Sequence, residues 1–261
     1  MLSEREQRLI ASLADRHQRR KQPYFVADGL RVCREAVERR PEWARLIVLT
    51  EAFAETPQGR AFLELPSVGR LRREVVSPSV FARLVETENP QGVACLLERP
   101  APREATELPR PFALILDRVA EPGNLGTILR SAWAVGLRQL WLVRGGADPF
   151  APKVVRAGMG AQFALDFAWF PSLAAARERL LQLGGQRLWC TEEAADVSVF
   201  DEQRFDLRNA GLVIGNEANG ISDTTLGTPV TIPMPGHAES LNVAQATTVF
   251  LFEAVRRGLL P

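Results

Sequence analysis

Five continuous apolar runs in the second half of the chain constrain the fold more than any other feature. They read FALILD at 112–117, QLWLVR at 139–144, RLWC at 187–190, GLVIG at 211–215 and VTIP at 230–233. Strands of a parallel sheet have such uninterrupted runs, because helices cover both faces of the sheet. The sequence therefore predicts an α/β domain with a mostly parallel sheet and helices on both faces.

Helical segments are predicted between and after these strands, at 124–135, 152–160, 172–183, 219–226 and 241–257. In folds of this class, ligands bind beyond the C-terminal ends of the strands. The loops that begin after Leu116, Val143, Cys190, Ile214 and Ile232 are therefore the places where a functional site is expected.

A proline-rich joint near residues 99–111 separates this domain from an earlier one. The stretch ERPAPREATELPRPF holds four prolines among polar residues, as linkers do. We expect a smaller N-terminal α/β domain at 1–105 and a second domain at 112–261. The first is predicted to hold strands at 45–50, in EVVS and in GVACLLE, and helices at 4–15, 28–40, 59–65 and 78–86.

Composition limits the class of protein. Apolar residues make up 46% and charged residues 24%, as in soluble globular proteins. The N-terminus is charged throughout and no apolar run reaches membrane-spanning length, so a cytoplasmic protein without a membrane partner is expected. Residues 1–111 carry a net charge of +3 and the remainder −2, which permits nucleic-acid binding by the first domain. With three isolated cysteines and two histidines, no metal site is expected.

The usual nucleotide-binding and hydrolase motifs are absent. No GxGxxG follows a predicted strand, and the chain contains neither GxxxxGK[ST] nor GxSxG. The common phosphate cradles of NAD-dependent enzymes and of nucleoside triphosphatases are therefore excluded.

Three polar loops at strand ends carry the candidate chemistry. The loop DRVAEPGNLGTILR has Asn124 at a predicted helix cap and Arg130 six residues later. In GNEANG, Glu217 stands where a helix is expected to begin, and in IPMPGHAESLN, Ser240 is a candidate cap before Asn242. Taken singly, each loop fits simple helix capping as well as ligand binding.

Together, in this order, the loops resemble the three motifs of the SpoU (TrmH-like) branch of the SPOUT RNA methyltransferases. The first motif, D-x-x-x-x-P-x-N-x-G-x-x-x-R, is matched by Asp117, Pro122, Asn124, Gly126 and Arg130. The second, G-[SN]-E-x-x-G, is matched by Gly215, Asn216, Glu217 and Gly220. The third, I-P-M-x-G-x-x-x-S-L-N-V, is matched by residues 232–243.

Other segments extend the resemblance over nearly the whole chain. PKVVRAGMGA (152–161) is similar to a family segment that usually has Ser at the position of Gly158. DGLRVCREAV (28–37) and NPQGVACL (89–96) are similar to the N-terminal substrate-binding domain of rRNA-directed members, with Asp28 where Glu is more usual.

The resemblance implies methyl transfer from S-adenosylmethionine to a ribose 2′-oxygen of RNA, by a homodimer whose C-terminal chain forms a trefoil knot. It implies that the knot backbone grips the cofactor. The implied cofactor contacts are Thr191, Gly215, Asn216, Ile232, Met234 and Leu241. The implied catalytic residues are Asn124, Arg130, Glu217, Ser240 and Asn242.

The separate N-terminal domain favours large-subunit (23S) rRNA as the substrate. Two other readings stay open at this point: ribose methylation of tRNA, and a non-catalytic RNA-binding ribosome assembly factor on the same fold. The intact polar residues of the three motifs favour catalysis over the second of these.

Overall fold

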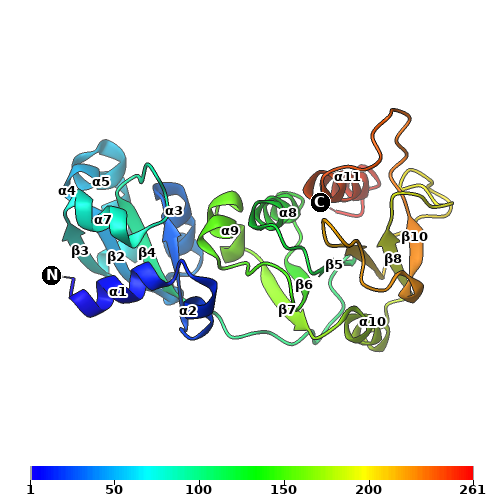
Figure 1. Cartoon of the computed structure of the whole chain (residues 1–261), viewed down its shortest axis with the longest axis horizontal. Coiled ribbons are helices and arrows are strands. Elements are labelled where there is room, and N and C mark those ends of the chain that lie inside the picture. The colour runs from blue at the N-terminus through cyan, green and yellow to red at the C-terminus, as the bar shows by residue number, and fades with distance from the viewer. Residues whose placement is uncertain (1, 261) are drawn as a thin grey trace. The chain divides into compact units, whose positions relative to one another are not determined.

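The computed structural model describes residues 2–260, and their contacts divide the chain into two compact units (Figure 1). One unit comprises residues 2–101 together with 148–164, and the other comprises 102–147 together with 165–260. The chain first passes from one unit to the other between Ala101 and Pro102, within the proline-rich stretch 99–111. Segment 148–164, which the sequence analysis assigned to the second domain, groups with the first unit.

The first unit is built on a four-stranded sheet in the order β1-β4-β2-β3. Strands β1 (Tyr24–Asp28) and β2 (Ala44–Thr50) both pair antiparallel with β4 (Val93–Glu98), whereas β3 (Arg72–Val76) pairs parallel with β2. The helices are α1 (Glu4–Ser12), α2 (Arg16–Arg20), α3 (Leu30–Arg39), α4 (Glu51–Glu55), α5 (Pro57–Leu63), α6 (Pro66–Gly69), α7 (Pro78–Leu84) and α9 (Pro152–Ala157), with short 3-10 turns at Pro41–Trp43 and Ala161–Phe163.

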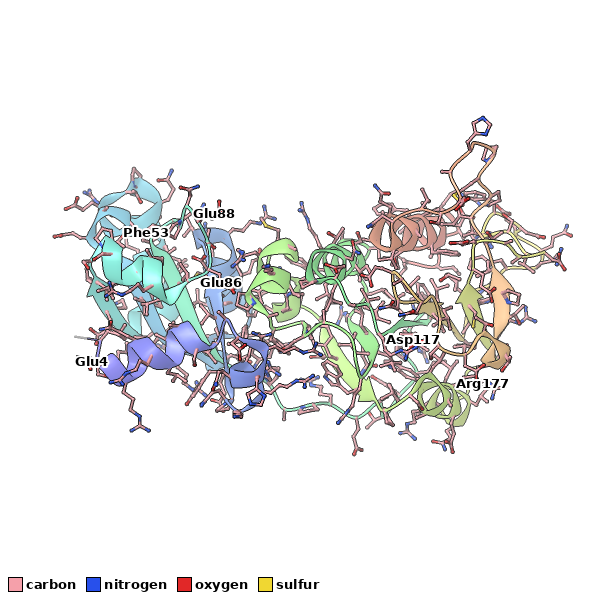
Figure 2. The ribbon with its side chains drawn as sticks, viewed as in Figure 1. Glu4, Phe53, Glu86, Glu88, Asp117 and Arg177 are labelled. Carbon is pink, nitrogen blue, oxygen red and sulfur yellow. The ribbon has the colours of Figure 1, made fainter. Side chains whose placement is uncertain are left out.

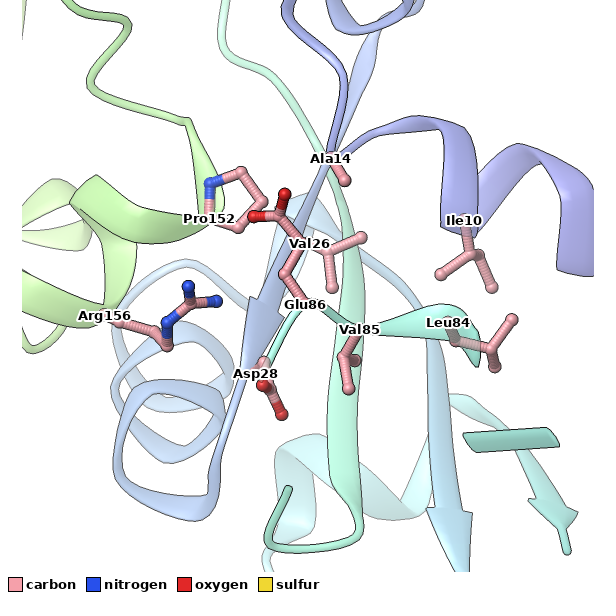
Figure 3. Close-up of a pocket in the computed structure, with 9 residues that line it drawn as sticks. All are labelled: Ile10, Ala14, Val26, Asp28, Leu84, Val85, Glu86, Pro152 and Arg156. Atoms are coloured by element: carbon pink, nitrogen blue, oxygen red, sulfur yellow. The ribbon is translucent and has the colours of Figure 1, made fainter. Parts of the chain in front are cut away.

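One face of this sheet is covered by α1 and α7. Apolar side chains of β1, β2 and β4 form a single cluster with residues of these two helices, among them Ile10 and Phe81. A cavity of only about 10 Å³ lies at its edge, beside Asp28 and Arg156 (Figure 3). Asp28 is 7% exposed and accepts a hydrogen bond from the Thr87 hydroxyl. Burial raises the pKa of Asp28, although Thr87 and Arg156 act in the opposite direction.

Buried charge explains why segment 148–164 belongs to the first unit. Asp148 accepts hydrogen bonds from Arg19 Nε at 2.9 Å and from Arg99 Nη2 at 2.7 Å, and the Arg19 side chain is only 4% exposed. A buried carboxylate needs such partners, because leaving it unpaired costs several kcal/mol. The ring of Phe150, two residues on, packs 4.9 Å from that of Phe25.

The second unit contains a six-stranded sheet in the order β10-β8-β9-β5-β6-β7, and every neighbouring pair is parallel. This confirms the predicted α/β class with a parallel sheet. The strands are β5 (Ala113–Asp117), β6 (Gln139–Val143), β7 (Asp166–Phe170), β8 (Arg187–Thr191), β9 (Ala210–Ile214) and β10 (Thr228–Val230). Strand β7 was not predicted; it is an edge strand, with Asp166 and Trp169 only half-buried.

Helices cover both faces of this sheet, as predicted. Helix α10 (Leu173–Gln182) packs its Leu173, Ala176 and Leu180 into the cluster on one face. Helices α8 (Pro122–Ala134) and α11 (Val243–Arg256) lie side by side on the other (Figure 1). Their contact includes the Ser131 and Thr248 hydroxyl groups, 3.0 Å apart.

Two predicted helices need correction. Segment 219–226 is not a helix: Asn216 and Gly220 exchange backbone hydrogen bonds of 2.9 Å in a tight turn, and only Thr224–Leu226 form a short 3-10 turn. Gly220 has a φ of +65°, which glycine adopts without strain and which a helix cannot accommodate. The last helix begins at Val243 rather than at 241.

No helix within residues 2–260 combines the length and the apolar character that crossing a membrane requires. In the same range, no group of three or more histidine, cysteine, aspartate or glutamate side chains is arranged to hold a metal ion.

Candidate active site

A cleft of about 780 Å³ lies at the C-terminal edge of the parallel sheet. Its walls come from the loops after β5, β8, β9 and β10 and from the start of α11. Every predicted site residue except Arg130 lines this cleft, namely Asn124, Thr191, Gly215, Asn216, Glu217, Ile232, Met234, Ser240, Leu241 and Asn242. Residues from three separated motifs therefore meet in one place.

Glu217 joins the second motif to the first. Its carboxylate accepts hydrogen bonds from the backbone N–H of Ala120 at 2.9 Å and of Glu121 at 3.0 Å, and from Asn124 Nδ2 at 2.9 Å. The expectation that Glu217 caps a helix of its own is wrong, since no helix follows it. It instead holds the backbone at the start of α8, where Glu121 makes no side-chain cap and where a negative charge is favourable.

Asn124 lies inside the first turn of α8 and does not cap it, as had been predicted, because the helix already begins at Pro122. Its amide donates to Glu217 Oε1, and its Oδ1 accepts from Asn242 Nδ2 at 3.0 Å. Both ends of the Asn124 side chain are thereby fixed between the second and third motifs.

Asn242 caps α11, a role that the sequence analysis assigned to Ser240. Its Oδ1 accepts hydrogen bonds from the backbone N–H of Ala244 at 3.0 Å and of Gln245 at 3.4 Å. The remaining Nδ2 is free to donate to Asn124. One side chain therefore starts the last helix and links it to α8.

Asn242 variants should separate these two functions. Asn242→Asp keeps the cap acceptor but loses the donor to Asn124, so we expect near wild-type thermal stability with reduced methyl transfer. Asn242→Ala also loses the cap and should lower the free energy of unfolding by about 1 kcal/mol. Chemical denaturation and a single-turnover assay measure the two effects. Equal stability losses in both variants would contradict the capping role.

The ionisation of Glu217 follows from its contacts. Burial raises its pKa, but hydrogen bonds from Ala120, Asn124 and Glu121 outweigh burial and hold the pKa below its ordinary value of 4.5. The carboxylate is therefore charged at neutral pH. A depressed folded-state pKa contributes stability that is present above the unfolded-state value and is lost as pH falls through the folded-state value.

Glu217→Gln tests this linkage. We expect the free energy of unfolding of the wild type to exceed that of the variant by the largest margin above the ordinary glutamate pKa of 4.5, and the margin to shrink as pH falls below that value. Urea denaturation of both proteins across this range measures it. A margin that stays constant with pH would show that the charge of Glu217 does not contribute.

Asn216 and Asp117 hold the surrounding loops. Asn216 Nδ2 donates to the carbonyl of Arg118 at 2.9 Å. The carboxylate of Asp117, labelled in Figure 2, is fully buried and accepts from the Ser222 backbone N–H at 2.6 Å. Asp117 matched the first motif and follows an apolar run directly. Neither feature of the sequence indicated that its carboxylate would contact the loop after β9.

The backbone of Gly220 and Ile221 lies so close to Gly215 that no side chain fits at that position. A Cβ atom there would lie 2.5 Å from the carbonyl carbon of Gly220 and 2.6 Å from the nitrogen of Ile221. The turn between β9 and the cleft therefore requires glycine at this position.

Arg130 stands apart from the network. It is exposed on α8, one turn beyond Thr127 on the same face of the helix. Within residues 2–260, no hydrogen bond or ion pair engages its guanidinium group. The side chain is therefore available to a ligand outside the cleft wall.

The cleft is electrically negative. Its lining includes Glu121, Glu192, Glu193 and Glu217 and contains no lysine, arginine or histidine. Nearby carboxylates also affect the buried thiol of Cys190. Burial, followed by the negative charges of Glu192, Asp117 and Asp223, raises the pKa of this thiol to about 12. The arrangement suits a ligand with positive charge and disfavours phosphate inside the cleft.

Comparisons with known proteins agree with the site. Residues 111–252 match the model of the SpoU rRNA Methylase family, and residues 7–95 match an MRM3-like substrate binding domain. The chain is 32% identical to the 23S rRNA (uridine(2479)-2′-O)-methyltransferase of Streptomyces viridochromogenes, over 98% of this chain and 90% of that protein. It is 40% identical to the 23S rRNA (guanosine-2′-O-)-methyltransferase RlmB of Xanthomonas axonopodis, over 58% of this chain and 60% of that protein.

A solved structure extends the likeness to the whole fold. The crystal structure of the SpoU methyltransferase AviRb from Streptomyces viridochromogenes, in complex with the cofactor AdoMet, superposes with a TM-score of 0.83 at 30% identity. The match covers 98% of this chain and 99% of that chain. The matched family model spans the residues that form the cleft, and the chain belongs to the SpoU rRNA methylase family.

Proposed function

We propose that the protein transfers a methyl group from S-adenosylmethionine to a ribose 2′-hydroxyl of large-subunit ribosomal RNA. The observation that carries this proposal is the chain of hydrogen bonds Glu217–Asn124–Asn242, which joins three motif loops at one cleft. The relatives named above are 23S rRNA 2′-O-methyltransferases, which supports both the reaction and the class of RNA.

The cleft has the size and charge that this cofactor requires. A volume of about 780 Å³ is within the range of small-molecule sites. S-adenosylmethionine, when bound, supplies a methyl group on a positively charged sulfur, and four glutamates without a basic residue suit that charge. Thr191, Gly215, Asn216, Ile232, Met234 and Leu241 are the residues we propose to hold it.

Arg130 is proposed to act on the RNA rather than on the cofactor. A ribose hydroxyl is a poor nucleophile until its proton is withdrawn, and a guanidinium group cannot take that proton because it is already fully protonated. Arg130 is therefore proposed to bind the phosphate beside the target ribose and to stabilise the negative charge that develops on the 2′-oxygen. Its exposure and lack of internal partners favour this role.

The hydrogen-bonded residues are proposed to set the geometry of the reaction. Asn124 and Asn242 hold each other in one orientation, and Glu217 fixes the start of α8, from which Arg130 projects. Ser240 lines the cleft and is proposed to contact the ribose. Alignment of this kind contributes a large part of the rate of transfer reactions.

We also propose that the segment from Ile232 to Asn242 is threaded through a loop as a trefoil knot. The path of the chain supports this: β10 forms one edge of the sheet, yet α11 returns to pack against α8, which follows the central strand β5. Thr231 also exchanges backbone hydrogen bonds with Val197 and Val199 before the segment begins.

A homodimer in the cytoplasm is proposed as the working form. Phe252 on α11 is 52% exposed, which is unusual for so large an apolar side chain and favours α11 as part of the interface. Light scattering that gives the mass of a single chain would contradict the dimer.

The first unit, through residues 7–95, is proposed to bind rRNA.

Transfer assays on purified RNA test the substrate class. The protein is incubated with isotopically labelled S-adenosylmethionine and, separately, with unmodified large-subunit rRNA and unmodified tRNA. We expect label in rRNA alone. Label in tRNA alone would favour the tRNA alternative, whereas cofactor binding without any transfer would favour an assembly factor.

A further inference from the structure

We infer that Arg118 is a further RNA-binding residue of this site, and that it holds a backbone phosphate at the rim of the cleft. The inference rests on the proposed function, because it requires an RNA chain to run across the C-terminal edge of the sheet. Arg118 occupies a variable position of the first motif, so the motif itself assigns it no role.

The backbone of Arg118 is held in a costly conformation. Its φ is +60°, in the left-handed region that residues with a side chain rarely adopt. The conformation is fixed from both sides, because its N–H donates to the carbonyl of Leu116 at 3.2 Å and its carbonyl accepts from Asn216 Nδ2 at 2.9 Å. Such strain persists only where the surroundings over-determine it, and it concentrates at functional sites.

The inner part of the Arg118 side chain lies against Asp117, whereas its two terminal nitrogens are accessible. Arg118 Nε lies 3.3 Å from Oδ1 of the buried Asp117, while the side chain as a whole is 41% exposed. Gly145 makes room for it, since a Cβ atom there would come within 3.3 Å of Arg118 Cδ. No hydrogen bond to any residue in the range 2–260 engages its two terminal nitrogens, which leaves them for a ligand.

Arg118 places a positive charge beside the mouth of the cleft, where the phosphates that flank a bound ribose would lie. Asp117 pairs with Val143 in the sheet, so Arg118 and Arg144 follow at neighbouring positions just beyond the strand ends. Asn216, which binds the Arg118 carbonyl, lines the cleft itself. Four glutamates make the cleft unfavourable for phosphate, so the phosphates that flank a ribose at its mouth require positive charge outside it.

The salt dependence of RNA binding distinguishes this role from a structural one. Each phosphate that a protein neutralises adds roughly 0.7 to 0.9 to the slope of log Kd against log salt concentration. Arg118→Gln removes the charge but keeps a polar side chain, and Arg118→Lys keeps the charge. The matched control is Arg138→Gln, which lies directly before β6, at the edge of the sheet opposite to Arg118, and whose side chain is also exposed.

Kd for an unmodified large-subunit rRNA transcript is measured by filter binding over a KCl series. We expect Arg118→Gln to weaken binding about tenfold and to lower the slope by about 0.7 to 0.9. Arg118→Lys should retain the wild-type slope, Arg138→Gln should match the wild type, and S-adenosylmethionine affinity should be unchanged in all three. Phosphate binding therefore predicts a change in RNA affinity and slope together.

A wild-type slope in Arg118→Gln would overturn the inference, as would an equal slope change in Arg138→Gln. Loss of thermal stability and cofactor affinity without a change in slope would assign Arg118 a structural role and would also overturn it. If the wild type binds the transcript but transfers no methyl group, the proposed function fails, while the slope comparison still decides whether Arg118 contacts phosphate.

Discussion

Arg130→Ala is expected to lower the single-turnover rate of methyl transfer by about 10²–10³-fold, as the loss of one well-placed electrostatic contact to a transition state does. Affinity for S-adenosylmethionine should stay within about twofold of the wild type, because Arg130 does not line the cleft. Rapid-quench transfer to saturating rRNA measures the first quantity, and equilibrium dialysis of the labelled cofactor measures the second.

Arg130→Lys separates charge from geometry. Lysine keeps the positive charge but loses the planar fork that binds phosphate through two hydrogen bonds. We expect a rate between those of the wild type and the alanine variant. A full wild-type rate in Arg130→Lys would show that the fork is unimportant, and a full rate in Arg130→Ala would remove Arg130 from the catalytic machinery.

Gly215→Ala should abolish measurable cofactor binding, with at least about a hundredfold rise in Kd. The new Cβ would lie 2.5 Å and 2.6 Å from backbone atoms of Gly220 and Ile221, which cannot move as a side-chain tip could. The displaced turn carries Asn216 and Glu217, so the cleft wall would shift. Overpacking of this kind typically costs about 1–3 kcal/mol of folding stability.

The same substitution at Gly69 is the control. Gly69 ends α6 in the first unit, and a Cβ atom there would meet no atom within 4 Å. Gly69→Ala should therefore leave cofactor affinity unchanged and leave stability equal or slightly higher. Calorimetric titration of both folded variants with S-adenosylmethionine makes the comparison. Tight binding by Gly215→Ala would contradict the described turn.

The sequence predicted the parallel sheet because strands buried on both faces leave uninterrupted apolar runs. Four of the five predicted runs are strands of the observed sheet. The fifth, at 230–233, shares only Val230 with β10, and the edge strand β7, with Asp166 and Trp169 half-buried, was missed. Segment 219–226 was mistaken for a helix because periodicity does not detect a turn closed by hydrogen bonds between Asn216 and Gly220.

Sequence reasoning was weaker on what each site residue contacts. It placed the motif loops at strand ends, and all of the candidate catalytic and cofactor-binding residues except Arg130 line one cleft. It could not predict that Glu217 would hold the start of α8, or that Asn242 rather than Ser240 would cap α11. The first contact joins residues 96 positions apart, and local patterns carry no information about such pairs. The cap contacts of Asn242 are local, but Ser240 and Asn242 are both residue types that cap helices, so the sequence does not decide between them. The catalytic roles stay predictions.

The position of the transferred methyl group tests the account most directly. Unmodified large-subunit rRNA is treated with the wild-type protein and labelled S-adenosylmethionine, then hydrolysed with alkali. Alkaline cleavage uses the free 2′-oxygen, so a ribose 2′-O-methyl group protects the adjoining phosphodiester. We predict label in an alkali-resistant dinucleotide from one site, and far less of it after the same reaction time with Arg130→Ala. Label released in mononucleotides, as methylation of a base would give, would contradict the account.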